Sequence, residues 1–236
     1  MDNMSYAVTV LSGGMDSTVL AHLSKGLNEK VDLVSVDYGQ RHRTELEFAA
    51  RTADKLGCRH DVVSLPIGEA LSSALTDTDV DVPHGHYAED NMAVTVVPNR
   101  NAILISVAYG IAVARGATTV QVGVHAGDHF VYPDCRPAFV DQLGVALKTG
   151  NEGFGQVELV APFVHQSKTD ICRLGDVLGV DWTDTWSCYE GGAVHCGRCG
   201  TCVERREAFR DAGVEDPTEY ADPDYAFEVL ARGSGS

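Results

Sequence analysis

The feature that most constrains the fold is a short apolar strand that leads through two glycines into a helix. Residues 6–11 (YAVTVL) are apolar and rich in β-branched side chains, which favours a strand. SGGMDS follows at once, and after it Val19, Leu20, Leu23 and Leu27 recur at helical spacing. A strand, a glycine turn and a helix in this order predict the first unit of a layered α/β fold.

The same order of strand and helix continues along the chain. Further β-branched runs predict strands at residues 31–38, 60–65, 119–124 and 157–161. Helical spacing predicts helices at 44–56, 101–114, 138–148 and 167–178, the last with Ser167 as its N-cap. Because strands that alternate with helices pair in parallel, we expect an α/β fold with a parallel twisted sheet flanked by helices. We expect the polar residues 76–91 to form a mobile loop, and the acidic tail after Pro217 to be weakly structured.

The turn Ser12–Ser17 is suited to a phosphate-type anion. Gly13 and Gly14 allow the backbone to approach a ligand closely, and the first amides of the following helix point at it. Ser12 and Ser17 can donate hydroxyl hydrogen bonds to phosphate oxygens. Asp16 cannot bind phosphate directly, so it is expected to hold Mg²⁺ or to organise the turn. The alternative to a phosphate site is a purely structural glycine turn with an Asp-Ser helix cap.

SGGMDS directly after the first strand resembles the signature of the PP-loop ATP pyrophosphatase family. That resemblance implies that ATP is cleaved between its α and β phosphates to activate a carboxylate as an adenylate. Neither the GxxxxGK[ST] loop nor a GxGxxG fingerprint is present, which argues against a P-loop enzyme and against a dinucleotide cofactor. The expected contacts to ATP come from Leu11, Ser12, Gly13, Gly14, Met15, Asp16, Ser17 and Thr18.

Four of the seven cysteines are spaced as metal ligands. Cys188, Cys196, Cys199 and Cys202 follow a C-x7-C-x2-C-x2-C pattern with glycines between them, which favours one structural zinc ion with a closed shell. An iron–sulfur cluster, His195 as a substitute ligand, and reduced free cysteines are the alternatives. We expect residues 1–180 to form a PP-loop ATP-binding α/β domain, and residues 181–236 to form a zinc-binding segment packed on it.

Five motifs in one order carry a more specific resemblance. After SGGMDS come DYGQRHRTE (37–45), VPNRN (97–101), YPDCRP (132–137) and CYEGG with CGRCGTC (188–202). Together they resemble the 7-cyano-7-deazaguanine synthase family of queuosine precursor biosynthesis over nearly the whole chain. The resemblance implies an ATP-dependent ligase that forms carbon–nitrogen bonds. It would activate 7-carboxy-7-deazaguanine, let ammonia form an amide, and then activate and dehydrate that amide to the nitrile.

The family context implies roles for charged residues outside the turn. Lys168 and Arg100, together with Asp16, are the catalytic candidates, because fixed positive charge stabilises the charge that develops at the α-phosphate. Asp128 is a candidate for a second Mg²⁺ contact. Each of these residues can also be an ordinary surface or helix-start residue.

The deazapurine acid presents N–H donors and a carboxylate that need partners. A carboxylate can accept paired hydrogen bonds from the N–H edge, and Asp134 is the first candidate for this, with Glu152 second. Arg136 can bind the substrate carboxylate with its bidentate fork. A covalent role for Cys135 stays open. The expected substrate-binding set is Arg41, Asp128, Tyr132, Asp134, Arg136 and Glu152.

Charge and hydropathy limit the partners of the chain. It carries 34 acidic and 18 basic residues, a formal charge of −16, which weighs against nucleic acid. No apolar run approaches the ~20 residues of a membrane span, so we expect a cytoplasmic protein that does not bind membranes. Free ammonium is the expected nitrogen source, since we see no glutaminase domain. A homodimer is implied by the family resemblance alone.

Three other functions are compatible with these motifs. A related enzyme can stop at the amide, or join the activated deazapurine to an amine of another molecule such as a protein. A zinc-ribbon-like binding module with a vestigial nucleotide turn would show no ATP turnover. A PP-loop enzyme that acts on tRNA should carry a basic face, and the composition gives no sign of one.

Overall fold

The protein folds around a five-stranded, fully parallel sheet. The computed structural model describes residues 5–41, 43–71, 73–87 and 92–233 of the 236-residue chain. The strand order is β3-β2-β1-β4-β5, and every neighbouring pair is parallel, which confirms the predicted fold class. The strands are β1 (Tyr6–Val10), β2 (Lys30–Asp37), β3 (Arg59–Ser64), β4 (Thr119–Gln121) and β5 (Glu158–Val160).

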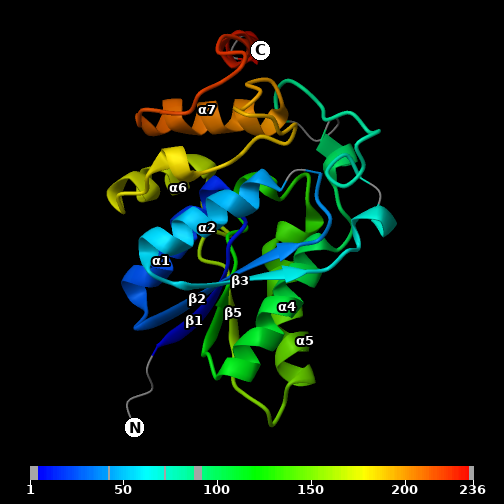
Figure 1. Cartoon of the computed structure of the whole chain (residues 1–236), viewed down its shortest axis with the longest axis vertical. Helices are drawn as coiled ribbons and strands as arrows, with labels where there is room; N and C mark the ends of the chain where they lie inside the picture. Colours follow the sequence, from blue (N-terminus) through cyan, green and yellow to red (C-terminus); the bar gives the residue numbers. More distant parts are fainter. Residues whose placement is uncertain (1–4, 42, 72, 88–91, 234–236) are drawn as a thin grey trace.

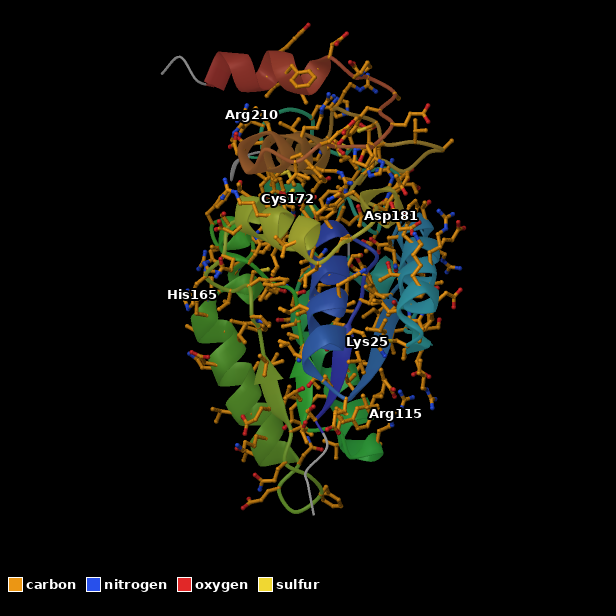
Figure 2. The ribbon with its side chains drawn as sticks, turned by 90° about the vertical axis from the view of Figure 1, so that its left-hand side faces the viewer. Lys25, Arg115, His165, Cys172, Asp181 and Arg210 are labelled. Carbon is orange, nitrogen blue, oxygen red and sulfur yellow. The ribbon has the colours of Figure 1, made fainter. Side chains whose placement is uncertain are left out.

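Helices cover both faces of the sheet and continue beyond its end. Figure 1 shows α1 and α2 on the opposite side of the strands from α4 and α5, with α6, α7 and the C-terminal helix stacked outward. In the side view, Cys172 on α6 and Arg210 on α7 lie at successive levels beyond α1 (Figure 2). The helices are α1 (Met15–Leu27), α2 (Thr44–Leu56), α4 (Arg100–Arg115), α5 (Pro137–Gly150), α6 (Lys168–Val177), α7 (Gly200–Ala212) and α8 (Tyr225–Gly233).

Strand β1 is buried on both faces, which accounts for its unbroken apolar sequence. Val8 and Val10 pack with Ala108 and Tyr109 of α4 on one face. On the other face, the hydroxyl of Thr9 lies 3.1 Å from that of Ser24 in α1. The strand therefore holds the turn that follows it at a fixed position between two helical layers.

The stretch Ala93–Arg115, which contains α4, is long and apolar enough to cross a membrane by length and composition alone. A core helix of a soluble protein passes the same test. Ile105, Ala108, Tyr109 and Ala112 are buried on one side of α4, where Ala108 and Tyr109 meet the sheet. These buried residues supply part of the apolar character of the stretch, whose most apolar window is 33% buried.

The prediction that the acidic tail is weakly structured is wrong for the last described residues. They form α8, in which Ala226 is fully buried and packs against Val203 of α7. The guanidinium of Arg206 also lies over the ring of Phe227, 4.1 Å from its centroid. The helix is therefore held by contacts with α7, which the acidic composition of the tail does not indicate.

The predicted loop at 76–91 contains no helix or strand in its described part, and residues 88–91 lie outside the described residues. Two of its side chains, Val82 and Tyr87, are nevertheless buried. The amide of Gly85 donates to the carbonyl of Arg198, at 3.0 Å. The described part of the loop is therefore packed against the cysteine segment.

Candidate active site

The phosphate-type turn joins the end of β1 to the start of α1. Gly13 has a φ of +85° and is buried, while Gly14 is extended at the N-cap of α1. The hydroxyl of Ser17 donates to the carbonyl of Gly14 at 3.1 Å and lies 3.0 Å from the hydroxyl of Ser12. The turn is thus braced by its own serines, and the positive end of α1 lies beside it.

A cavity of about 210 Å³ opens beside this turn, where the carboxyl ends of the strands lie. In open parallel sheets this edge is the usual location of a ligand site. Asp16, Arg100 and Lys168, the predicted catalytic residues, all line the cavity. The structure therefore brings together charges from α1, α4 and α6 that are far apart in the sequence.

Lys168 is held between two carboxylates next to the turn. Its Nζ lies 3.2 Å from Oδ2 of Asp16 and 2.9 Å from Oε2 of Glu204. Burial disfavours the ammonium, but the attraction of these two carboxylates outweighs it and raises the pKa of Lys168 above its usual value. Burial likewise opposes ionisation of Asp16, and the charge of Lys168 overcomes it and lowers that pKa. Both groups therefore carry their charges at the mouth of the phosphate turn.

The side chain of His125 is almost fully buried and lies near Asp16. Its Nδ1 accepts a hydrogen bond from the amide of Gly127 at 3.1 Å, so its Nε2 carries the proton when the ring is neutral. Nε2 lies 3.3 Å from Oδ2 of Asp128 and 3.7 Å from Oδ2 of Asp16. Nε2 nevertheless makes no hydrogen bond among the described residues, so it lies close to both carboxylates without a partner.

The carboxylates near Lys168 can also hold a cation. One ligand atom each of His125, Asp128 and Glu204 lies within 4.8 Å of the others. Oδ1 of Asp16 is buried and has no hydrogen-bond partner among the described residues. A buried carboxylate oxygen without a partner is the kind of ligand that a hard divalent ion prefers. The sequence suggests Asp16 and Asp128 for such contacts but misses Glu204, because its position in α7 carries no motif of its own.

The far part of the cavity is aromatic and contains a second charged pair. Tyr38, Trp186 and Tyr189 line it together with Glu45 and Arg100. A recess of about 50 Å³ shares these five residues with the cavity and is also lined by Gln40, Arg41, Leu75 and Cys188, but by no residue of the turn. The cavity therefore has a phosphate-type part and an aromatic part. Sequence reasoning misses Glu45, although this residue ends the motif DYGQRHRTE.

Four of the six predicted substrate contacts line neither the cavity nor the recess: Tyr132, Asp134, Arg136 and Glu152. Oδ2 of Asp134 accepts a hydrogen bond from the amide of Asn101 at 3.0 Å, which caps α4. Nε of Arg136 donates to the carbonyl of His129 at 2.7 Å. Glu152 is exposed in the turn that follows α5. The structure thus gives Asp134 and Arg136 local backbone partners and places Glu152 at the surface.

Of the remaining predicted contacts, some line the cavity or the recess and others are buried beside it. Asp128 lines the cavity, whereas Tyr132 is buried and its hydroxyl lies 2.6 Å from that of Thr95. Arg41 lines the small recess, and its Nη1 donates to the carbonyl of Val80 at 2.8 Å. Of the predicted ATP contacts, those from the turn that line the cavity are Ser12, Gly14, Met15, Asp16 and Ser17, whereas Leu11, Gly13 and Thr18 are buried beside it.

Cys135 lies in the cavity wall as a protonated thiol. Its sulfur accepts a hydrogen bond from Nδ2 of Asn101 at 3.3 Å. Burial, followed by the nearby charges of Asp128 and Asp134, raises the pKa of the Cys135 thiol well above its ordinary value. A thiol in this state is a poor nucleophile, so the structure offers no support for a covalent role.

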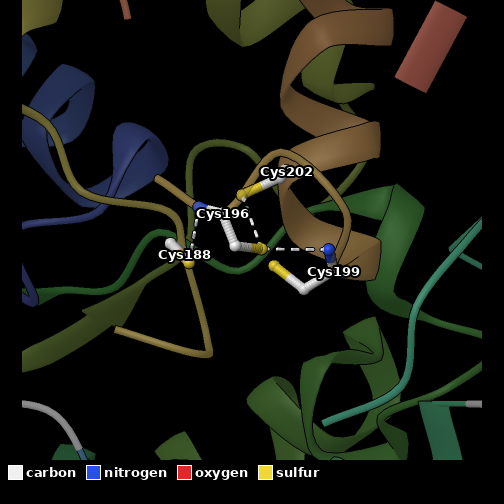
Figure 3. Close-up of side chains that lie close together, drawn as sticks. All are labelled: Cys188, Cys196, Cys199 and Cys202. Carbon is white, nitrogen blue, oxygen red and sulfur yellow. Dashed lines mark hydrogen bonds between the residues drawn. The ribbon is translucent and has the colours of Figure 1, made fainter. Parts of the chain in front are cut away.

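The four predicted metal ligands come together as a buried sulfur cluster (Figure 3). One sulfur of each of Cys188, Cys196, Cys199 and Cys202 lies within 4.8 Å of the others, and the sulfurs of Cys196 and Cys202 are 3.9 Å apart. A tetrahedral metal with ~2.3 Å bonds to sulfur needs separations of this size. Four buried cysteines can therefore hold a metal ion.

Backbone amides and a nearby histidine support the cluster without entering it. The amide of Cys199 donates to the sulfur of Cys196 at 3.2 Å, an interaction that favours thiolates. His195 packs against Trp186 with ring centroids 4.3 Å apart and the rings tilted by 38°, and its Nε2 accepts from the amide of Ser187 at 3.0 Å. Its Nε2 is therefore occupied by the backbone, and the group of close ligand atoms contains the four cysteines without His195, which argues against His195 as a substitute ligand.

The fold and the site define an α/β protein with a turn suited to an anion at the carboxyl edge of a parallel sheet and a cluster of four cysteines that can bind a metal ion. A family model described as "Queuosine biosynthesis protein QueC" matches residues 6–213. Curated proteins named 7-cyano-7-deazaguanine synthase are similar over most of their length. The one from Ruegeria pomeroyi is 56% identical over 220 residues, 92% of this chain and 95% of that protein. The one from Rhizobium meliloti is 55% identical over 229 residues, 96% of each.

This chain belongs to the QueC family of queuosine biosynthesis proteins. Among solved structures, that of NMN synthetase from Francisella tularensis covers 99% of this chain and 86% of that chain, with 15% identity and a TM-score of 0.49. A likeness of that size adds no argument about function. The family membership therefore rests on sequence, and it accounts for the five motifs in their order.

Proposed function

We propose that this chain is an ATP-dependent enzyme that converts 7-carboxy-7-deazaguanine and ammonium into 7-cyano-7-deazaguanine. Membership of a family whose curated members are named for that product supports the nitrile, rather than the alternative that stops at an amide or modifies another molecule. The observation that carries the proposal is the single cavity in which the phosphate-type turn, Lys168 and an aromatic pocket meet. Such a cavity can hold a nucleotide phosphate and a flat base together.

The chemistry needs a good leaving group on a poor electrophile. An oxygen of the substrate carboxylate attacks the α-phosphorus of ATP, and the bond to the β-phosphate oxygen breaks, releasing pyrophosphate. Ammonia then attacks the activated carbonyl and displaces AMP, which gives the amide. The amide oxygen then attacks the α-phosphorus of a second ATP and releases pyrophosphate, while the nitrogen loses one proton. Elimination of AMP, which carries that oxygen away, with loss of the second N–H proton gives the nitrile. Lys168, which lies beside the turn, stabilises the negative charge that develops at the phosphate.

Mg²⁺ and Zn²⁺ are the ions that the donor groups favour. Asp16, Asp128 and Glu204 would hold Mg²⁺, which neutralises the charge of ATP as it enters this acidic part of the cavity. The four sulfurs from Cys188 to Cys202 would hold Zn²⁺, and a closed four-thiolate shell gives that ion a structural role. Both identities follow from donor chemistry: oxygen for the first ion and thiolate for the second.

Free ammonium, a cytoplasmic location and a homodimer complete the proposal. Ammonium follows from the reaction, and its replacement by glutamine should abolish product formation. The acidic balance of the chain supports small-molecule substrates rather than nucleic acid. Sedimentation at several protein concentrations measures the oligomeric state.

The test of the proposed function is the mass of the product. Purified protein is incubated with the deazapurine acid, ATP, Mg²⁺ and ammonium, and the product is weighed while pyrophosphate is measured. We expect the nitrile, together with pyrophosphate release that depends on the acid. Asp16→Ala should abolish that release and leave the zinc content unchanged. An amide as the end product, or ATP cleavage without the acid, would contradict the proposal.

A further inference from the structure

Glu45 and Arg100 form an acceptor and a donor in the aromatic part of the cavity. Both line the main cavity and the recess. Their charges attract: loss of hydration on burial raises the pKa of Glu45 to about 7, and Arg100 is the strongest opposing influence. Among the residues that the structure describes, no direct ion pair joins these two side chains. Arg100 hydrogen-bonds the Tyr38 hydroxyl, and a guanidinium with five N–H groups keeps further donors for a ligand.

The protein partners of Glu45 leave part of its carboxylate available. Nε2 of Gln40 donates to its Oε1 at 3.1 Å. No hydrogen bond to Oε2 is found among the described residues, which do not include the neighbouring residue 42. Oε2, and the second lone pair of Oε1, can therefore accept hydrogen bonds from a molecule in the cavity.

Flat surfaces flank this pair. Tyr38, Trp186 and Tyr189 share the same wall of the cavity and of the recess. The indole of Trp186 is itself fixed, because its Nε1 donates to the carbonyl of Cys188 at 2.9 Å and its ring packs at a tilt against that of His195. A rigid aromatic wall beside a polar pair is suited to a planar heterocycle that stacks and hydrogen-bonds along one edge.

The polar pair matches the edge of a guanine-type base. That edge presents a carbonyl oxygen at position 6, an N–H at position 1 and an amino group at position 2, in that order. A carboxylate accepts from the two neighbouring N–H groups, and a guanidinium donates to the adjacent carbonyl. An adenine-type edge offers an amino group and an unprotonated ring nitrogen instead, so the same pair would leave the ring nitrogen facing a carboxylate.

We propose that the carboxylate of Glu45 accepts hydrogen bonds from the N1–H and the 2-amino group of the deazapurine, and that Arg100 donates a hydrogen bond to its 6-carbonyl oxygen. The proposal rests on the proposed function and names the residues that select its substrate. It takes the role first considered for Asp134 and Glu152, neither of which lines the cavity. It also assigns Arg100 to the base instead of to the phosphate, so that Lys168 is the cation that acts beside the turn.

This arrangement orients the reacting group as well as selecting the base. The carboxyl group of the substrate is on the five-membered ring, away from the edge that Glu45 holds. With that edge at the aromatic wall, the carboxyl group is free to face the turn, where Lys168 and Asp16 lie. Recognition of the base would therefore place the nucleophilic oxygen near the phosphate of ATP.

The test pairs a change in the protein with a change in the ligand. Binding of 7-carboxy-7-deazaguanine, and of the same acid without its 2-amino group, is measured by calorimetry on wild type, Glu45→Gln and the control Glu47→Gln. Glu47 is an exposed residue of the same helix. The measurement is made at least about one pH unit above the Glu45 pKa of about 7, so that Glu45 is a carboxylate. We expect removal of the amino group to weaken binding to wild type and to the control roughly tenfold or more, since it leaves a charged acceptor unpaired.

Glu45→Gln should bind the natural acid roughly tenfold more weakly and should discriminate between the two acids by less than about threefold. Its zinc content and KM for ATP should equal those of wild type. Undiminished discrimination would overturn the proposal. A raised KM for ATP with unchanged binding of both acids would instead assign Glu45 to the nucleotide. Failure of the proposed function appears separately, as absence of the nitrile in wild-type reactions.

Discussion

The ammonium nitrogen of Lys168 lies 2.9 Å from Oε2 of Glu204, and this contact joins α6 to α7 at the edge of the active site. Glu204 is two residues beyond Cys202, one of the four buried cysteines, and both lie in α7. A metal ion bound to the cysteines would therefore fix the start of the helix that presents Glu204. In this way a structural metal site can control the position of Lys168, the cation that we propose to act at the phosphate, without touching a substrate.

Glu204→Gln should lower kcat and leave the zinc content unchanged. The amide keeps the shape of the side chain, but it loses the charge that holds the ammonium of Lys168. We expect a decrease of roughly tenfold in kcat, since a charge-assisted hydrogen bond contributes about 1.5–3 kcal/mol. The control is Glu207→Gln, which removes a carboxylate of the same helix that pairs with Arg210 at 3.6 Å. Equal kcat values for both variants would exclude a positioning role for Glu204.

Cys196→Ser should lose metal first and activity as a consequence. The sulfur of Cys196 accepts hydrogen bonds from the amides of Arg198 and Cys199, so it lies at the centre of the cluster. A structural metal contributes folding free energy directly, and we expect the melting temperature to fall by roughly 10 °C or more. Zinc content by elemental analysis and thermal unfolding measure the two effects.

The control for that variant is Cys58→Ser, at a half-buried thiol outside the cluster. It should retain its metal and unfold within about 2 °C of wild type, because one hydroxyl replaces one partly exposed thiol. If Cys196→Ser kept a full equivalent of zinc and its stability, the cluster would not be the metal site.

The alternation of apolar strands and helices was sufficient to predict the parallel sheet, because a strand buried on both faces must be apolar throughout. Strand ends were less accurate. The predicted strand at 119–124 stops at Gln121, and Val122 and Val124 instead line the cavity. Ladder pairing with β1 also ends at Gln121, which faces Thr9. Where a neighbouring strand ends depends on the assembled sheet, and local sequence does not contain that information.

The sequence predicted the position of a site correctly where the spacing of its residues is typical of one kind of ligand. Four cysteines at ligand spacing and a serine–glycine turn after a strand each favour one kind of ligand, and both assemble as predicted. Single carboxylates were harder to assign. Asp134 caps the start of α4, whereas Glu45 and Glu204 face the cavity, and nothing in their local sequence separates these uses. Their roles follow from which helix turn points at the cavity.

Glu45 should make the stability of the protein depend on pH between about 4.5 and 7. Burial is the main cause of its raised pKa of about 7, against an ordinary value of 4.5, with Arg100 and Gln40 opposing the rise. The folded state therefore holds this proton over a range in which the unfolded chain has lost it. Stability from this group is fully present below pH 4.5 and is lost as the pH rises toward 7.

Glu45→Gln removes that dependence, because glutamine does not titrate. Relative to wild type, the variant should gain stability as the pH rises from 5 to 7.5, by at most about 3 kcal/mol at 1.36 kcal/mol per pKa unit, and by less where the cavity admits water. Urea unfolding of both proteins across this range measures the difference. A difference that stays constant with pH, or that grows toward low pH, would contradict a raised pKa at Glu45.

Gly13→Ala should damage both the phosphate turn and the residue that we assign to the base. Gly13 has a φ of +85°, and a Cβ there would lie 2.0 Å from the carbonyl oxygen of Glu45. The added methyl group must push α2 away from the turn. We expect a loss of roughly 2–5 kcal/mol of stability, from backbone strain and overpacking together.

The matched control is Gly57→Ala at the end of the same helix. Its φ is +59°, but a Cβ there meets nothing within 4 Å. It should cost only about 1–2 kcal/mol from backbone strain and should bind both substrates normally. Gly13→Ala should bind ATP and the deazapurine acid each at least about tenfold more weakly, because moving α2 displaces Glu45 while the turn itself distorts. Normal affinity for the acid with weakened ATP binding would show that the turn and the base site are not mechanically linked through Glu45.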